Sequence, residues 1–178
     1  MMKIFTKQSG FTLVEALVSI SILVMAVVGA FTAAQSGIAT STYSKNQTIA
    51  FYLAGEAVEQ IRNLRDNNGL NTSAWLTNIA GPVGTGYPCD QSKVCKIDAI
   101  SSPTISECSG GICPNLNLDP ANGFYGYSDS YASSTIFNRQ IRMTQINANE
   151  WAISVKVNWD NRDPNKFFEI RENILNWQ

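Results

Sequence analysis

Histidine is absent from this sequence of 178 residues, and charged side chains make up only 15 % of it. Without histidine, the chain lacks the usual general base and the commonest metal ligand of proteins. The charged fraction is below the roughly 25 % that is usual for soluble domains. The deficit is local, because no charged side chain occurs between Glu15 and Lys45. The remainder is polar and well mixed, which predicts one modest globular domain that folds in water.

Features typical of catalytic sites are missing as well. The sequence has no glycine-rich phosphate loop before a helix and no pair of carboxylates at a suggestive spacing. Serines are plentiful, but nothing beside them would activate one as a nucleophile. The 13 basic and 14 acidic side chains offer no broad basic surface for phosphates. We therefore expect no enzyme, no catalytic residue, no bound metal or cofactor, and no duplex nucleic acid as the main partner.

What the sequence does contain is a long apolar run near its N-terminus. Residues 1–10 are basic and polar, with Lys3 and Lys7, and the residues after them are almost wholly apolar. The 19 residues from Ala16 to Ala34 carry no charge. As a helix rising about 1.5 Å per residue they nearly match a hydrocarbon core of roughly 30 Å. The lysines should stay in the cytoplasm, so the C-terminal domain should face outward.

Simple explanations of this run leave one residue unexplained. An ordinary signal peptide would be cut after small residues, which the stretch 26–34 supplies. A plain signal anchor would account for the length and the lysines. Neither explains Glu15, because an ionisable side chain at the edge of an apolar membrane helix is costly and calls for a partner. The alternative that Glu15 only reaches the headgroups remains open.

The run from Gly10 to Ala16, Gly-Phe-Thr-Leu-Val-Glu-Ala, resembles the class III signal of prepilins, the precursors of type IV pilins and pseudopilins. In that family a basic leader ends in glycine, and glutamate is fifth in the mature chain. The resemblance implies that a membrane-embedded prepilin peptidase cuts between Gly10 and Phe11 and N-methylates the new Phe11 amine. It also implies that this amine pairs with Glu15 of a neighbouring subunit, which neutralises both charges and sets the register of the helices.

Small residues recur every four positions within the apolar run, at Gly29, Ala33 and Gly37. Such a face lets helices approach closely in a membrane or a filament core, and general membrane-helix composition explains it equally well. Many major pilins carry a proline at the position of Thr32. Its replacement here favours a minor pilin or pseudopilin.

The helical pattern continues beyond the apolar run. Apolar residues recur at steps of three and four from Ile49 to Leu64, which predicts an amphipathic helix. The opposite face carries charged residues that include Arg65, with a favourable spacing between Arg62 and Asp66. The run Asn-Asn-Gly at 67–69 predicts the helix end.

The sequence near the C-terminus predicts an antiparallel sheet. Apolar and polar residues alternate strictly from Trp151 to Trp159, which predicts a half-buried strand whose apolar face packs on the helix. The segment with Phe137, Ile141 and Met143 predicts the preceding strand, with a turn at 147–149. The segment 167–174 suits either a third strand or a short helix.

These patterns predict an α+β fold, in which a long N-terminal helix packs on a small antiparallel β-sheet head, as in pilins. The expected parts are a cleaved leader, a transmembrane or filament-core helix, an amphipathic helix half, a variable cysteine-containing loop region and an antiparallel sheet, at residues 1–10, 11–44, 45–68, 69–134 and 135–178.

Four cysteines, Cys89, Cys95, Cys108 and Cys113, fall within one polar segment. An even number of cysteines in an exported loop predicts disulfides. Three pairings are possible, and we favour the sequential one, which joins residue 89 to 95 and residue 108 to 113. Zinc is an alternative, although only the last two cysteines approach its usual spacing.

Two other segments allow a functional interpretation beside a structural one. The residues 160–165, Asp-Asn-Arg-Asp-Pro-Asn, supply oxygen ligands for calcium, or they form a hairpin turn in which Arg162 opposes a cation. The residues 123–127, Gly-Phe-Tyr-Gly-Tyr, form a stacking surface for a glycan or single-stranded DNA, or a loop or edge strand that buries its rings.

The function implied by the resemblance is that of a structural subunit. Such a subunit spans the inner membrane once, with its N-terminus in the cytoplasm. After processing, a membrane assembly platform with a cytoplasmic ATPase transfers it from the bilayer into a filament of other pilin subunits. The alternative function is a membrane-anchored extracellular binding or adhesin module that never polymerises.

Overall fold

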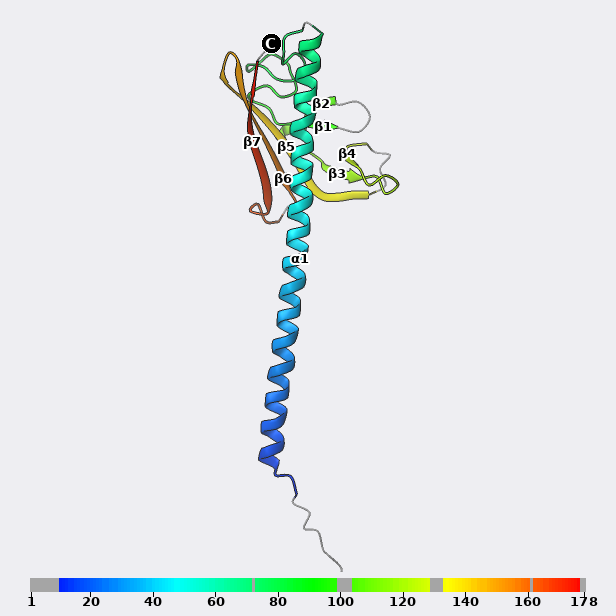
Figure 1. Ribbon diagram of the computed structural model, residues 1–178, viewed down its shortest axis with the longest axis vertical. Helices are drawn as coiled ribbons and strands as arrows, with labels where there is room; N and C mark the ends of the chain where they lie inside the picture. Colours follow the sequence, from blue (N-terminus) through cyan, green and yellow to red (C-terminus); the bar gives the residue numbers. More distant parts are fainter. Residues whose placement is uncertain (1–9, 72, 99–103, 129–132, 161, 177–178) are drawn as a thin grey trace, which may run out of the picture. The chain divides into compact units, whose positions relative to one another are not determined.

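The computed structural model describes residues 10–71, 73–98, 104–128, 133–160 and 162–176. It divides into two compact units, residues 1–44 and 45–178. Helix α1 (Leu13–Leu70) contributes to both units, and the seven strands of the described residues belong to the second (Figure 1). The expected fold class is confirmed, because a long N-terminal helix precedes an antiparallel sheet.

Thr12 caps the start of α1. Its side-chain oxygen accepts a hydrogen bond from the backbone N–H of Glu15 at 3.3 Å, and its carbonyl accepts one from Ala16 at 3.1 Å. Threonine at the cap with glutamate three residues later is the pattern of a capping box, and a carboxylate is favourable near the positive end of the helix dipole. Further along, the hydroxyls of Ser19 and Thr32 donate to carbonyls four residues earlier. The apolar run therefore satisfies its own polar groups.

The C-terminal part of the chain is an antiparallel meander. It consists of β5 (Ser133–Asn147), β6 (Glu150–Asn158) and β7 (Phe167–Leu175), with β6 paired to both others. Alternate residues of β6 are buried, so the prediction of a half-buried strand there is confirmed. The segment from Phe167, for which the sequence allows a strand or a short helix, is a strand.

The predicted loop region at 69–134 contains four short strands that the sequence analysis missed. They are β1 (Cys95–Asp98), β2 (Thr104–Glu107), β3 (Asn115–Leu118) and β4 (Tyr125–Gly126). The strands β1 and β3 pair with β5, and the resulting strand order is β2-β1-β5-β3-β4, with β6 and β7 branching from β5. Each of the four has at most four residues, so alternation cannot stand out in the sequence.

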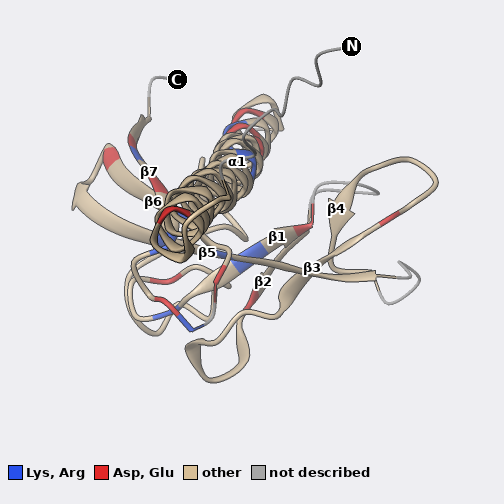
Figure 2. Cartoon of the chain, turned by 90° about the horizontal axis from the view of Figure 1, so that it is seen from below, with Lys and Arg blue, Asp and Glu red and all other residues tan. Residues whose placement is uncertain are grey.

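The core of the second unit lies between the C-terminal half of α1 and the sheet. The buried residues Leu53, Ala57 and Ile61 of α1 belong to one cluster with Ile153 and Val155 of β6. This packing confirms the predicted apolar faces of both elements, and each large aliphatic side chain contributes about 1.5–3 kcal/mol by its burial. Charged residues of both signs are spread over the strands and loops (Figure 2).

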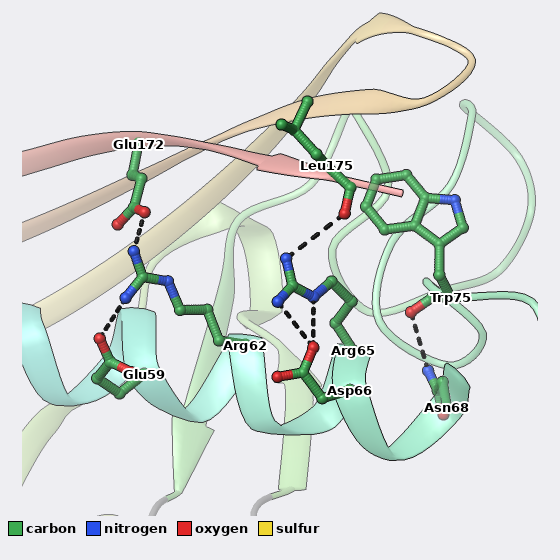
Figure 3. A network of polar contacts seen from close by, with 8 residues as sticks. All are labelled: Glu59, Arg62, Arg65, Asp66, Asn68, Trp75, Glu172 and Leu175. Atoms are coloured by element: carbon green, nitrogen blue, oxygen red, sulfur yellow. Dashed lines mark hydrogen bonds and ion pairs between the residues drawn. The ribbon is translucent and has the colours of Figure 1, made fainter. Parts of the chain in front are cut away.

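The polar face predicted for this half of α1 is wrong at Arg65, whose side chain is buried. Figure 3 shows the reason, because the end of β7 lies over this side of the helix. Arg65 pairs with Asp66 at 2.7 Å and donates to the carbonyl of Leu175 at 3.5 Å. Arg62, for which the spacing predicts Asp66 as the partner, instead pairs with Glu172 of β7. Contacts made by a distant strand cannot be read from helical spacing.

The helix ends at Leu70, directly after the predicted stop at 67–69. The side-chain amide of Asn68 donates to the carbonyl of Trp75 at 3.2 Å (Figure 3) and to that of Thr77 at 2.9 Å. The last turn of the helix therefore holds the chain that follows it.

Arg139 of β5 is fully buried. Its guanidinium donates to the carbonyl of Leu53 at 2.9 Å and to the carboxylate of Glu56 at 2.8 Å, both on α1. It also donates to the carbonyl of Ile97 in β1 at 2.7 Å, so one side chain joins the helix to two strands. The sequence analysis missed it, although Arg139 is in step with the inward-facing Ile141. A charge at an inward position of a strand is the signal that would have found it.

We expect Arg139→Ala to lower the free energy of unfolding by about 3–5 kcal/mol, because Glu56 would lose its cation and buried carbonyls would lose their donor. Urea denaturation of the full chain in detergent micelles, followed by the fluorescence of the buried Trp151 and Trp159, measures the change.

The matched control is Arg142→Ala, which removes an exposed arginine from the same strand. This change should cost less than about 0.5 kcal/mol. Equal losses in the two variants would mean that the buried contacts of Arg139 are not what stabilises the unit.

Candidate functional site

The bond between Gly10 and Phe11 lies just outside the helix. Both residues are exposed, and α1 begins at Leu13. A side chain placed on Gly10 would meet no described atom within 4 Å. A protease needs an accessible, non-helical backbone, so this arrangement suits cleavage between these two residues. The leader residues Lys3 and Lys7 lie outside the described part of the chain.

Glu15 is exposed in the first turn of α1 and makes no ion pair with the residues that the structure describes. In the uncut chain the nitrogen of Phe11 is a neutral peptide amide. Hydrolysis after Gly10 would turn it into an α-amine, which is protonated over much of the physiological pH range. Cleavage would thus create a cation close in sequence to a carboxylate that has no partner among the described residues.

The apolar side chains of α1 are exposed all round in the first unit. The exposed fraction is 57 % for Leu17, 75 % for Met25 and 64 % for Phe31. Among the described residues, α1 is the one helix long and apolar enough to cross a membrane, and its most apolar window has no residue buried inside the chain. Because an apolar surface of this extent is unfavourable in water, lipid or other protein must cover it.

The small residues of this run also face away from the chain. Apart from the helix's own backbone and the adjacent residues, no described atom lies within 4 Å of the position where a side chain would start at Gly29 or Gly37, and Ala33 is exposed. The backbone there is open to the close approach of a second helix. A role in helix packing stays a prediction.

The four cysteines form two disulfides, Cys89–Cys95 and Cys108–Cys113, with Cα–Cα distances of 5.3 Å and 4.8 Å. Of the three pairings that the sequence allows, this is the sequential one, and it leaves none of these thiols for zinc. All four residues are buried. The first bond attaches the loop before β1 to the sheet, and the second closes the turn between β2 and β3. In a chain-entropy model, loops of this size contribute about 2 kcal/mol each.

The aromatic segment 123–127 is divided between packing and exposure. The ring of Tyr125 in β4 meets Phe137 edge to face, with 5.9 Å between centroids. The hydroxyl of Tyr127 donates to the carbonyl of Arg139 at 3.2 Å, and burial raises the pKa of this phenol. Only Phe124 of the three rings is exposed, at 56 %. The segment therefore offers one open ring rather than a row of stacking platforms.

The acidic segment 160–165 connects β6 to β7, which agrees with its interpretation as a hairpin turn. The carboxylate of Asp160 accepts hydrogen bonds from the Lys166 ammonium at 2.9 Å and from the backbone N–H of Arg162 at 3.0 Å. The bond from Lys166 is the main reason that the pKa of Asp160 lies below its usual value. An ammonium already occupies the position that a metal cation would need.

Comparison with known proteins gave one match. The prokaryotic N-terminal methylation motif matches residues 5–31, which include Gly10, Phe11, Glu15 and the first part of α1. No curated protein and no solved structure matched the chain.

The matched region and the fold agree with each other. The motif spans the exposed Gly10–Phe11 bond, the capped start of α1 and its apolar surface. The second unit packs the other half of the same helix on an antiparallel sheet. The chain therefore carries the class III signal that is typical of type IV pilins and pseudopilins, joined to a pilin-like α+β fold.

Proposed function

We propose that this chain is a structural subunit, a minor pilin or pseudopilin, of a type IV pilus or a type II secretion-like filament. The observation that carries the proposal is the N-terminal methylation motif, placed at an exposed bond immediately before a capped apolar helix. Glu15 lies in the first turn of that helix without an ionic partner among the described residues.

The proposed pathway starts in the inner membrane. The apolar half of α1 would span the bilayer once, with the leader lysines in the cytoplasm and the head outside. A prepilin peptidase would cut after Gly10 and methylate the Phe11 amine. An assembly platform with a cytoplasmic ATPase would then move the subunit from the bilayer into the filament. There, other subunits would cover the apolar surface that lipid covered before.

The charge of Glu15 explains why the processed chain would pair with a neighbouring subunit. A carboxylate in an apolar environment is costly without a cation, and the amine of a processed neighbour supplies one. Such a buried pair adds little net stability, but it can fix one register between helices. The exposed small residues Gly29, Ala33 and Gly37 would let neighbouring helices pack closely in the register that this pair fixes.

The alternative function is a membrane-anchored extracellular binding module that never polymerises. An anchor of that kind needs the apolar helix, but it needs neither removal of the leader nor an acidic residue in the helix. Glu15 therefore favours the filament over the isolated anchor.

The first prediction concerns processing. Co-expression with a prepilin peptidase should remove residues 1–10 and add one methyl group, and both changes should be missing without the peptidase. Intact mass spectrometry of the full chain measures them. The same measurement without and with reductant tests the two disulfides. Each should gain two hydrogens on reduction, four in all.

Gly10→Val should block this processing. A side chain at position 10 meets no described atom within 4 Å, so a loss of cleavage would reflect recognition by the peptidase rather than misfolding. Gly37→Val, at an equally open position, is the matched control and should be processed normally. An uncut wild-type chain, or a cut near Ala34, would contradict the pilin pathway.

The second prediction concerns assembly. Glu15→Ala should leave cleavage intact, because the cap uses only the backbone N–H of Glu15. It should reduce incorporation into sheared filaments by about tenfold or more. The reason is that the N-terminal amine of the neighbouring subunit would lose its carboxylate, and a charge left unpaired in an apolar environment costs roughly 3–5 kcal/mol. Immunoblots of sheared and membrane fractions, from a strain that assembles the filament, give the ratio.

Ser19→Ala is the matched control in the next turn of the helix. Among the described residues, its hydroxyl bonds to the carbonyl of Glu15 in its own helix, so incorporation should be unchanged. Normal filaments with Glu15→Ala would show that the charge-pairing role is wrong, even if the leader is removed as predicted.

A further inference from the structure

The face of the β5–β6–β7 meander that points away from α1 carries a cationic hollow. Inward-facing residues of β6, such as Val155, lie in the core with the helix, so the residues between them point outward. Strand register aligns Arg142 with Ser154, and Ser154 with Arg171, in one row across the three strands. In the adjacent row Lys156 of β6 is opposite Glu169 of β7.

The hollow is formed by a difference in side-chain size. Ala152 and Ser154 on the central strand are short, and long side chains from the neighbouring strands, Arg142 and Arg171, surround them. The resulting depression has a volume of about 480 Å³. Because adjacent strands are about 4.8 Å apart, the Cα atoms of the two arginines lie roughly 10 Å from each other. Ser154 lies between them on the central strand.

The hollow has an excess of positive charge. Among the described residues that line it, Glu169 is the one acidic residue. Its carboxylate accepts bonds from Arg171 at 2.8 Å and from the hydroxyl of Ser154 at 2.6 Å. These two contacts, that of Arg171 first, lower the pKa of Glu169, so it stays ionised. Arg142 and Lys156 make no ion pair with the described residues. They leave a net charge of about +2 on a chain whose total is −1.

The neighbouring groups restrict what anion fits. Neutral polar side chains, Gln140 and Thr144, line the hollow beside the cations. The described residues that line the hollow include no aromatic ring, and the ring of Phe167, beside it on β7, is covered by the ammonium of Lys156 at 3.9 Å from the ring centroid. A nucleic acid strand would therefore find no open ring for base stacking, and two uncompensated cations are few for a phosphate backbone.

We propose that this face binds an acidic polysaccharide through its carboxylate or sulfate groups. Such a polymer carries one anionic group among several hydroxyls. The hollow carries Arg142 and Lys156, which make no ion pair with the described residues, among the amide of Gln140 and the hydroxyls of Thr144 and Ser154. Arg142 provides a planar donor pair that matches a carboxylate or sulfate, and Lys156 adds a second charge in the next row. This binding is a property of the head, and it does not depend on assembly into a filament.

The test measures binding of the full chain in detergent micelles to four soluble polymers at low salt. They are heparin (sulfated), polygalacturonate (carboxylated), dextran (neutral) and oligo-dT (phosphodiester). Heparin or polygalacturonate should bind, and whichever binds more tightly identifies the anionic group. Dextran should not bind. Failure of both acidic polysaccharides, or binding of oligo-dT alone, would overturn the proposal.

Variants locate the binding. Arg142→Gln should weaken the affinity about tenfold, and the double change with Lys156→Gln should abolish binding. Glu169→Gln should tighten binding, because it removes the one negative charge of the hollow, and a misfolded protein cannot produce that gain. Arg162→Gln, which removes the same charge from the exposed β6–β7 loop, is the matched control and should change the affinity less than about twofold. Equal losses at positions 142 and 162 would show unspecific charge attraction and overturn the proposed site.

Discussion

The packing of one face of α1 on the sheet is the contact on which the second unit depends. The residues at 50, 53, 54, 57, 58 and 61 are buried, and they form one cluster with the inward faces of β5 and β6. The other half of the same helix has no such partner, and its apolar side chains are exposed on every side. A helix satisfies its backbone hydrogen bonds internally, so one helix can serve both an apolar environment and a protein core. The two halves differ only in the side chains that they present.

Residues 12–15 both cap the start of α1 and hold the Glu15 side chain in its first turn. Thr12 and Glu15 are spaced as a capping box, and the bond from the backbone of Glu15 to the hydroxyl of Thr12 starts α1 immediately after the Gly10–Phe11 bond. This leaves the Gly10–Phe11 bond, the proposed cleavage site, in non-helical chain while the carboxylate is held in the first helical turn. The same glutamate therefore contributes to the local structure through its backbone, and its side chain remains available for the proposed ionic contact with another subunit.

Period-two alternation gives the sheet two faces with different chemistry. Within β6, Ile153 and Val155 pack on the helix, whereas Ser154 and Lys156 line the cationic hollow. In β5 the pattern is interrupted at Arg139, which takes an inward position and bonds to α1 and β1. A buried arginine of this kind is costly unless every neighbour is in place, so it makes the relative position of helix and strands more specific than apolar packing alone would.

The local periodicity of the sequence was sufficient to predict the long helix and the half-buried strand at Trp151, because each depends on neighbours in the chain. The N-terminal motif was predicted from the resemblance of residues 10–16 to the prepilin signal, which is also a local feature of the sequence. Periodicity could not assign the short strands β1–β4, which form only by pairing with β5 and with each other. It also misassigned Arg65 and Arg62, because each has a contact to β7, more than a hundred residues away in sequence, beside its contact to a nearby carboxylate of α1. Residue order alone thus determined which segments are helical, which are apolar and where the N-terminal methylation motif lies. Only tertiary structure decided the ion pairs of Arg62 with Glu172 and of Arg139 with Glu56, and the cationic hollow, since each requires segments distant in sequence to lie side by side. It also selected the sequential disulfide pairing from the three that the sequence allows.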